Sequence, residues 1–186
     1  YFKLYTLTVD QNLSFANLIA SVSMEDRAFA DARSYDYFGA AYFNPGAILP
    51  TTGFQINTVK SPTEEVRLVS RQDQRLRWTT GVFHQSYHRG YLELFTEPGF
   101  DLYAQNNYGL PPDSSRATYG TPAPDMTFCG PTDIRERQSA VFGEATYAVT
   151  PKLDLTAGLR YFDFKQSFSF FSTGLIGAQA PGIPLS

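Results

Sequence analysis

Two histidines four residues apart, His84 and His88, are the first residues in this chain whose type and spacing suggest chemistry. On a helix, this spacing would let both imidazoles bind one metal ion. The residues around them alternate in the manner of a strand, however, and four residues of a strand separate the two rings by about 13 Å, at about 3.3 Å per residue. One metal ion cannot bridge that distance, so we expect no metal site at these histidines.

The other reactive side chains are too dispersed to define an active site. They are Glu93 and Glu97, Asp113 with Ser114 and Ser115, and the single cysteine, Cys129. No base and orienting group accompany the hydroxyls, and the lone cysteine, which can form no internal disulfide, is expected to be an inert loop thiol. A Gly-x-Ser-x-Gly elbow, a P-loop and a dinucleotide fingerprint are missing from the sequence. We therefore expect no catalytic residues, no cofactor and no enzymatic activity.

Composition narrows the class of protein further. The chain has 186 residues, a formal net charge of -3, 42% hydrophobic residues and 16% aromatic residues. It carries no basic stripe, which argues against nucleic acid as a partner. The most apolar run, at 15–22, is much shorter than the roughly 18 residues of a membrane helix. Because the chain begins at Tyr1 without a methionine or a signal peptide, we expect it to be a piece of a longer protein.

Alternation of apolar and polar residues predicts the elements that position these side chains. In residues 141–161, apolar or small residues occupy odd positions on both sides of the turn at 150–152, so both apolar sets share one face of a hairpin. Similar hairpins are predicted at 4–25 and 65–82. The predicted strands are about 3–10, 16–26, 63–70, 76–88, 136–149 and 153–171, with long loops at about 27–62 and 89–135.

The apolar face could pack on a protein core, as in a soluble sandwich, or on lipid. Short turns at one end and long loops at the other are rare in a sandwich and typical of outer-membrane barrels. In the last strand the apolar set passes from odd to even positions after Tyr161, nine residues from Leu153, close to the 9 to 11 residues with which a tilted strand crosses a membrane. Either a bulge or a change of environment explains that switch. Trp78, Tyr147 and Tyr5 fall about where aromatic girdles lie.

Specific strings strengthen the lipid interpretation. EVRLVS at 65–70, followed by a polar turn and LRWTTGVF at 76–83, resembles a recurring "E-x-R-L-x-S … L-x-W-x-x-G-x-F" hairpin in the barrels of TonB-dependent outer-membrane receptors. AVFGEATY at 140–147 with LDLTAGLRY at 153–161 is similar to another hairpin of that family, ending in its frequent "G-x-R-Y". The hairpin at 7–25 is similar but less distinctive.

The resemblance implies a Gram-negative outer-membrane receptor that takes up a nutrient such as an iron-siderophore complex. Expected partners are membrane lipid, a plug domain, the remaining barrel strands, the TonB complex and the nutrient. This chain lacks a plug domain, a TonB box and a closing aromatic strand, and barrels of this kind have about 22 strands. The expected fold is therefore all-β: an antiparallel meander of about six long strands, in three hairpins, that forms an open internal segment of a large transmembrane β-barrel.

Two sets of candidate site residues follow from this interpretation. Polar residues expected to face the barrel lumen or plug are Glu65, Arg67, Glu144 and Arg160. Extracellular loop aromatics expected to contact a ligand are Tyr35, Tyr37, Tyr42, Phe54, Tyr103, Tyr108 and Tyr119. Two alternatives remain at this point: another outer-membrane porin or channel, and a soluble all-β binding module.

Overall fold

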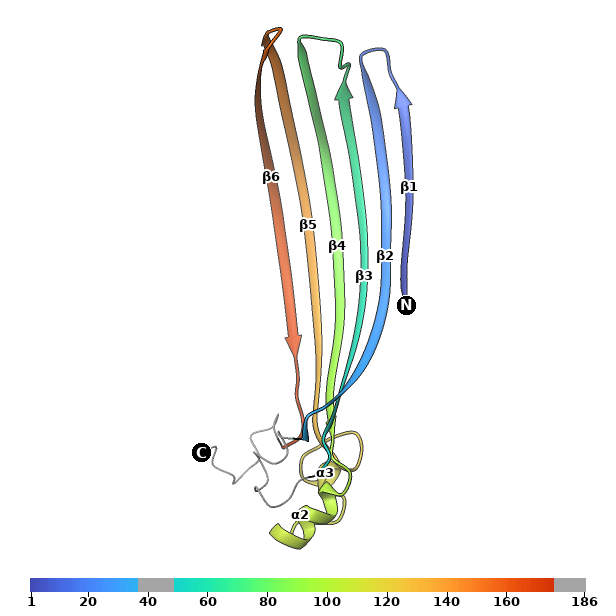
Figure 1. Cartoon of the computed structure of the whole chain (residues 1–186), viewed down its shortest axis with the longest axis vertical. Coiled ribbons are helices and arrows are strands. Elements are labelled where there is room, and N and C mark those ends of the chain that lie inside the picture. Colours follow the sequence, from blue (N-terminus) through green and yellow to red (C-terminus); the bar gives the residue numbers. More distant parts are fainter. Residues whose placement is uncertain (37–48, 176–186) are drawn as a thin grey trace. The chain divides into compact units, whose positions relative to one another are not determined.

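The computed structural model describes residues 1–36 and 49–175. In this part of the chain, six strands form one sheet in the order β1-β2-β3-β4-β5-β6, each strand pairing with its sequence neighbours (Figure 1). The strands are β1 (Phe2–Asn12), β2 (Ala16–Ser34), β3 (Thr52–Ser70), β4 (Leu76–Thr96), β5 (Met126–Thr150) and β6 (Leu153–Phe170). Two helices, α2 (Phe100–Tyr108) and α3 (Ser114–Ala117), lie between β4 and β5. The prediction of an all-β antiparallel meander is confirmed. None of the described helices is long and apolar enough to cross a membrane.

The three predicted hairpins form with short turns. In the first, β1 and β2 are antiparallel, with Leu7 opposite Val22 and Asn12 opposite Asn17. The other two turns separate Ser70 from Leu76 and Thr150 from Leu153. The apolar residues of each hairpin therefore share one face, as the alternation predicts.

The strands are much longer than the sequence predicts. Residues 27–34, 52–62, 89–96 and 126–135, assigned above to long loops, belong to strands, and β5 alone has 25 residues. The prediction was wrong because the apolar alternation ends before the backbone pairing does. Polar contacts continue across the extended strands, as between Gln55 and Glu93, whose side chains are 2.9 Å apart. A strand forms wherever its backbone finds hydrogen-bonding partners, whereas apolar alternation is present only where one face of the strand lies in an apolar environment.

The chain divides into two compact units. The first contains Tyr1–Arg27, Val59–Arg89 and Ile134–Ser167, with all three short turns. The second contains Ala28–Thr58, Gly90–Asp133 and Phe168–Ser186, with both helices.

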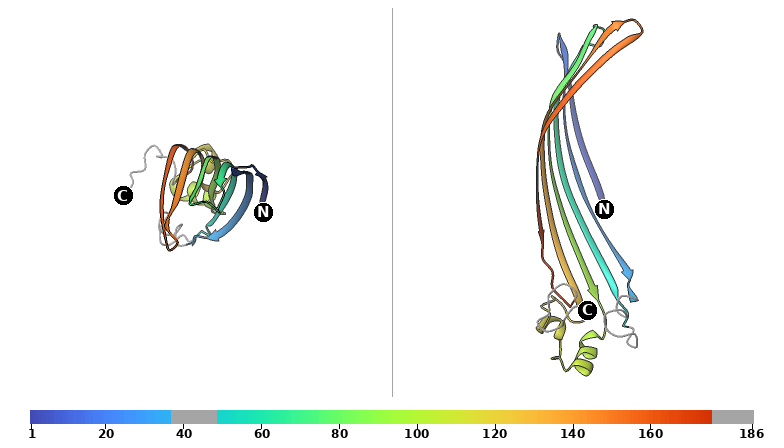
Figure 2. Two further views of the ribbon diagram at one scale, coloured as in Figure 1. Left: turned by 90° about the horizontal axis from the view of Figure 1, so that it is seen from above. Right: turned by 90° about the vertical axis from the view of Figure 1, so that its left-hand side faces the viewer.

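In the first unit the strands form a single layer, which Figure 2 shows from two further sides. The apolar face is open: Leu7 is 68% exposed, Leu155 67% and Leu159 87%. The buried hydrophobic residues in the described part of this unit are small, namely Ala16, Val59 and Ala140. A sandwich would bury large side chains between two layers. No second layer of the described chain covers this face, so the sandwich interpretation is wrong for these residues.

The switch of apolar positions in β6 does not come from a bulge. Thr146 and Thr156 are 2.8 Å apart on one side of Tyr161, and Gln166 donates to Glu136 over 2.7 Å on the other side. Both pairs belong to one unbroken antiparallel register, whereas a bulge would shift it by one residue. The change of environment is therefore the explanation that remains.

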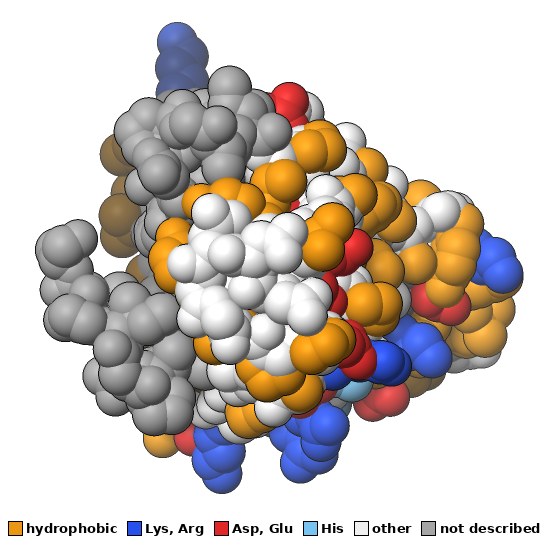
Figure 3. All heavy atoms as spheres, turned by 90° about the horizontal axis from the view of Figure 1, so that it is seen from below, with side chains coloured by type: hydrophobic (Ala, Val, Ile, Leu, Met, Phe, Trp, Pro, Cys, Tyr) orange, Lys and Arg blue, Asp and Glu red, His pale blue; other side chains and the backbone are white. Residues whose placement is uncertain are grey.

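The second unit has a small core around its helices. Phe100, Ala104 and Tyr119 are buried there, with Leu49, Tyr103, Leu110 and Leu175 packed against them. Gly99 (φ 91°) and Gly109 (φ 65°) flank α2, where left-handed backbone favours glycine. Figure 3 views the molecule from below, where hydrophobic side chains surround a central patch of uncharged side chains and backbone.

Candidate functional site

The polar face of the first unit carries all four residues predicted to face a lumen. Glu65 and Arg67 form an ion pair of 3.4 Å along β3, and both side chains are partly exposed. The guanidinium of Arg160 on β6 lies over two aromatic rings of neighbouring strands, 5.1 Å from the centre of Phe83 and 5.8 Å from that of Phe142. Such cation-π contacts fix the position of an arginine while leaving its N–H groups free to donate.

Gly81 makes room for this aromatic arrangement. A Cβ atom at residue 81 would lie 2.7 Å from Cζ of Phe142 and 2.7 Å from the carbonyl oxygen of Val66. Any side chain larger than hydrogen would therefore displace the Phe142 ring or the strand beside it. Because it has no side chain, Gly81 leaves the space that the Phe142 ring occupies beside Arg160.

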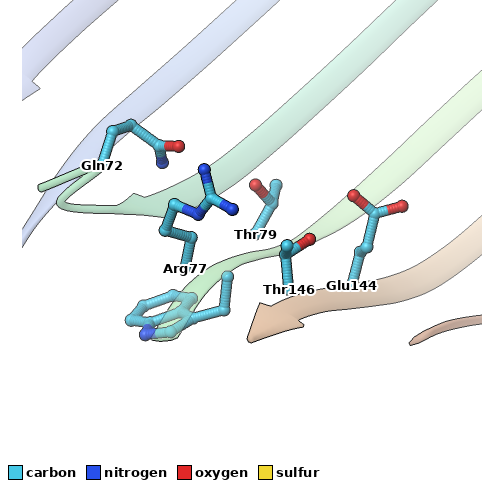
Figure 4. A pocket seen from close by; sticks show the side chains of 6 residues that line it. Gln72, Arg77, Thr79, Glu144 and Thr146 are labelled. Atoms are coloured by element: carbon cyan, nitrogen blue, oxygen red, sulfur yellow. The ribbon is translucent and has the colours of Figure 1, made fainter. Parts of the chain in front are cut away.

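Glu144 lines a polar cavity of about 220 Å³ near the turn end of the first unit. Figure 4 shows Gln72, Arg77, Thr79, Glu144 and Thr146 around it, drawn from three neighbouring segments. Trp78 completes the lining. The cavity combines one anion, one cation and neutral donors, which suits it to water or to a polar segment of protein more than to an apolar ligand.

Arg77 is the main polar-face residue that the sequence analysis missed. It forms an ion pair with Asp154, and its Nε is buried without a hydrogen-bond partner in the described structure. The sequence could have revealed both residues. Alternation along the strands places Arg77 on the same face as Gly81 and Phe83, and Asp154 on the same face as Arg160. A further neutral pair, Gln85 with Ser61 at 3.1 Å, lies on the same face.

The structure does not gather the predicted loop aromatics in one place. Tyr35 packs against Phe95 with tilted rings whose centres are 5.2 Å apart, and Tyr103 meets Tyr108 edge to face at 5.9 Å. Phe54 lies on β3 and is 37% exposed, so it is a strand residue and not a loop residue. Tyr37 and Tyr42 lie outside the described residues.

Tyr119 has a different role from the one expected. It is only 7% exposed and packs on Phe100, with ring centres 6.2 Å apart. A ligand cannot stack on a ring that already forms the core of the second unit. Of the two predicted aromatics in α2, Tyr103 and Tyr108, the more exposed is Tyr108, at 59%.

Two carboxylates in the second unit have opposite electrostatic environments. Glu97 is fully buried, and burial raises the pKa of its carboxyl despite hydrogen bonds from Thr127 and Thr51. Its Oε2 has no partner in the described structure. Asp101 is also partly desolvated, which acts to raise its pKa, but hydrogen bonds from Ser115, the backbone of Asp125 and Ser114 lower that pKa overall.

Asp101 also explains the Asp113, Ser114 and Ser115 cluster. The hydroxyls of Ser114 and Ser115 donate to Oδ1 of Asp101 over 3.0 and 2.7 Å, and the backbone N–H of Asp125 donates to Oδ2 over 3.0 Å. The cluster is a clamp that joins α2, α3 and the chain before β5. Its serine hydroxyls already donate to a carboxylate, which gives the cluster a structural role.

The remaining reactive residues do not form a site in the described structure. His84 and His88 both lie on β4, and Nδ1 of His84 is 2.9 Å from the hydroxyl oxygen of Ser139. In residues 1–36 and 49–175, no three His, Cys, Asp or Glu residues are grouped to hold a metal ion. Cys129 lies in β5 and is partly buried, so its expected place in a loop was wrong.

Comparisons with known proteins agree with this geometry. The family model described as "TonB dependent receptor-like, beta-barrel" matches residues 2–180. No curated protein matches the chain. A solved structure, the ferric yersiniabactin uptake receptor FyuA from Yersinia pestis, matches with a TM-score of 0.62 and 12% identity over 94% of this chain. The match spans 22% of the FyuA chain, so this chain covers about a fifth of that receptor's length.

The chain belongs to the TonB-dependent receptor β-barrel family, whose members are transporters of the Gram-negative outer membrane and not enzymes. The open six-stranded sheet corresponds to part of such a barrel. Family membership also sets aside the two alternatives that the sequence left open, an unrelated porin and a soluble binding module. Plug, TonB and ligand are the partners that the family implies in general.

Proposed function

We propose that this chain is an internal segment of the barrel wall of a receptor that takes up a scarce nutrient, such as an iron-siderophore complex, with energy delivered through TonB. The observation that carries the proposal is the single-layer sheet of the first unit, apolar and open on one face, charged on the other, within the residues that the family model matches. Six strands are too few to close a membrane barrel, the smallest of which has about eight. FyuA, the similar structure, takes up ferric yersiniabactin, and this supports an iron chelate as the nutrient.

In this proposal the polar face lines the lumen and meets the plug. Glu144, Arg77 and Gln72 line a polar cavity of about 220 Å³ that could receive a polar group of the plug, and Arg160 presents a guanidinium over two rings. Glu65 and Arg67 already satisfy one another, so they contribute less to a plug contact. Loop aromatics contact the nutrient, with Tyr35, Tyr103 and Tyr108 as the described candidates and Tyr119 removed from the set.

Uptake tests the proposal directly. The intact receptor containing this chain would be expressed in Gram-negative cells that lack their own siderophore receptors, with and without TonB. We expect radiolabelled iron to enter with a ferric siderophore only when both receptor and TonB are present. Uptake of a cobalamin or an oligosaccharide in place of iron would contradict the choice of nutrient, and uptake that persists without TonB would contradict the mechanism.

The plug contact has its own test in the same receptor. Replacing Glu144 and Arg160 together by alanine leaves the net charge unchanged and is expected to increase hydrogen exchange in the plug. The matched control replaces Arg71 and Asp73, an exposed pair 2.8 Å apart in the turn between β3 and β4. Equal exchange in both variants and in the unmodified receptor would contradict a role for Glu144 and Arg160 in holding the plug.

A further inference from the structure

The second unit is strongly acidic, whereas the chain as a whole is only mildly so. This unit contains eight Asp and Glu residues and two Arg residues, a formal charge of -6 within a chain whose total is -3. Both arginines are already bonded to carboxylates, because Arg33 lies 2.6 Å from Asp31 and Arg116 donates to Asp113 over 2.7 Å. The eight acids are Asp31, Asp36, Glu93, Glu97, Asp101, Asp113, Asp125 and Asp133.

One of these acids, Glu93, lies on the side of the sheet that carries the predicted lumen residues. Alternation along β4 places it on the same side as Arg77 and Gly81. Its carboxylate accepts a hydrogen bond from Gln55 on β3 over 2.9 Å. A surface of one sign slows the approach of ligands of that sign, so this unit disfavours an anionic ligand relative to a neutral or cationic one.

Four aromatic residues follow one another across the same side of the second unit. The ring centre of Phe95 on β4 lies 5.2 Å from that of Tyr35, next to the end of β2, and 5.5 Å from that of Phe128 on β5. The rings of Phe128 and of Phe170 on β6 both lie beside Gly130, where a Cβ atom would be 2.6 Å from the first and 3.4 Å from the second. We call Tyr35, Phe95, Phe128 and Phe170 the aromatic row.

A glycine on β3 makes the aromatic row continuous. A Cβ atom at residue 53 would lie 2.5 Å from Cε2 of Tyr35 and 2.7 Å from Cε1 of Phe95. Because neighbouring strands lie about 4.8 Å apart, β2 and β4 are separated by about 10 Å with β3 between them. The two rings therefore meet over Gly53, in space that any other residue would occupy.

The aromatic row keeps accessible ring surface. Phe170 is 53% exposed, and Tyr35, Phe95 and Phe128 are partly exposed. Aromatic rings bind other rings in offset or edge-to-face arrangements, and their faces attract cations. The rings and the acidic charge thus favour the same kind of ligand, one that bears aromatic groups and has no net negative charge.

We propose that the aromatic row makes the receptor selective for ferric chelates that bear aromatic groups and no net negative charge, and that Gly53 permits this selectivity. The inference rests on the proposed function, in which this side of the sheet faces the lumen and an iron chelate is the nutrient. It is narrower than that function. Three catecholates leave their ferric complex triply negative, and simple hydroxamates form neutral complexes without rings, so the proposal disfavours both.

The test compares three synthetic ferric chelates on the intact receptor in a neutral detergent, with binding followed by quenching of the receptor's intrinsic fluorescence. Two are neutral trihydroxamates on one tripodal scaffold, one with phenyl and one with methyl groups. The third is a tris-catecholate, which is aromatic and triply negative. We expect the phenyl trihydroxamate to bind about tenfold more tightly than the methyl one, a difference that contacts between aromatic rings can supply.

Gly53→Ala tests the role of the glycine, because the added methyl group would displace the rings of Tyr35 and Phe95. We expect this variant to lose the preference for the phenyl trihydroxamate. The matched control is Gly90→Ala on β4, in the same unit, where the added Cβ would meet the rotatable hydroxyl of Thr58. The control should keep the preference, and equal preference in the two variants would overturn the role of Gly53.

A second pair of variants tests the rings without altering a glycine. Phe95→Leu keeps an apolar side chain and should reduce the phenyl preference by about threefold. The control is Phe171→Leu, because Phe171 is 65% exposed and follows Phe170 in an extended chain that directs it to the other side. A phenyl preference that survives Phe95→Leu, or that falls equally in both variants, would overturn the aromatic row.

The tris-catecholate tests the charge. We expect it to bind more weakly than the phenyl trihydroxamate at low salt, with a difference that shrinks as salt screens the acids. Glu93→Gln should narrow the difference by about threefold at low salt, whereas Asp73→Asn, in the turn between β3 and β4, should not change it. Equal or tighter binding of the tris-catecholate, or a difference that neither salt nor Glu93→Gln alters, would overturn the selectivity for charge.

Iron uptake distinguishes this inference from the proposed function. A receptor that takes up iron with TonB but binds the phenyl and methyl trihydroxamates equally would contradict the aromatic row alone. A receptor that prefers the phenyl trihydroxamate but transports no iron chelate would contradict the proposed function alone.

Discussion

Gly81→Ala tests whether the polar face depends on close contact between a glycine and an aromatic ring. The added methyl group would meet Phe142 Cζ and the Val66 carbonyl oxygen, each at 2.7 Å, and Cβ of Arg67 at 2.9 Å. Overpacking of this kind typically costs about 1–3 kcal/mol. Against it stands the gain from replacing glycine in a strand, about 0.5–1 kcal/mol.

Gly143→Ala on β5 is the matched control. Its added Cβ would find its nearest neighbour, the Thr80 hydroxyl oxygen, at 3.7 Å, an ordinary contact. We therefore expect Gly143→Ala to be neutral or slightly stabilising and Gly81→Ala to be less stable than this control by about 1–3 kcal/mol. The Gly81 variant should also release the Phe142 ring from its contact with Arg160.

The assay is denaturant unfolding of the intact receptor in detergent, followed by the gel mobility of the folded barrel. A receptor with Gly81→Ala that is as stable as one with Gly143→Ala would refute the argument. Such a result would mean that the strands shift easily by several tenths of an ångström at this position. The support proposed for Arg160 would then have no structural basis.

Two further predictions concern the carboxylates of the second unit. Burial raises the pKa of the Glu97 carboxyl, so the protonated form that stabilises the fold is lost as pH rises through that pKa. Glu97→Gln should therefore leave the free energy of unfolding unchanged at low pH and increase it at higher pH. The pKa of Asp101 is lowered, so its contribution is present at neutral pH and lost as pH falls; Asp101→Asn should destabilise α2 by about 1–3 kcal/mol at neutral pH and by less in acid. Hydrogen exchange of residues 97–125 as a function of pH checks both, and parallel pH profiles for the two variants would contradict the opposite signs.

The sequence predicted the first unit well because one physical environment governs it. Where a strand crosses hydrocarbon, each alternate residue must be apolar, and that requirement is visible as a period of two. The turns before Ala16, Leu76 and Leu153 and the shared face of Val141 and Leu155 follow from it directly. Glu65, Arg67, Glu144 and Arg160 could be assigned to the opposite face by parity alone.

Outside that environment the sequence was a weaker guide. Asn57 and Ser61 of β3 are buried although polar, and their alternation carries no apolar signal. The core made by Phe100, Ala104 and Tyr119 is held by contacts between segments far apart in sequence, so Tyr119 looked like any other loop aromatic. The carboxylate clamp at Asp101 depends on the fold of α3, which a run of two serines does not predict.

Depth along the strand, and not strand identity, decides the chemistry of each side chain in the first unit. On β6, odd positions are apolar from Leu153 to Tyr161 and carry Asp163 and Lys165 beyond it, while the register with β5 stays the same. The backbone therefore keeps every side chain on its original face, and only the medium outside that face changes. A residue such as Lys165 is then exposed for the same reason that Leu159 is exposed, because each matches the layer beside it. Exchanging their positions would place a charge in hydrocarbon, which costs about 2–4 kcal/mol for a lysine at the midplane of a bilayer and less toward its edges.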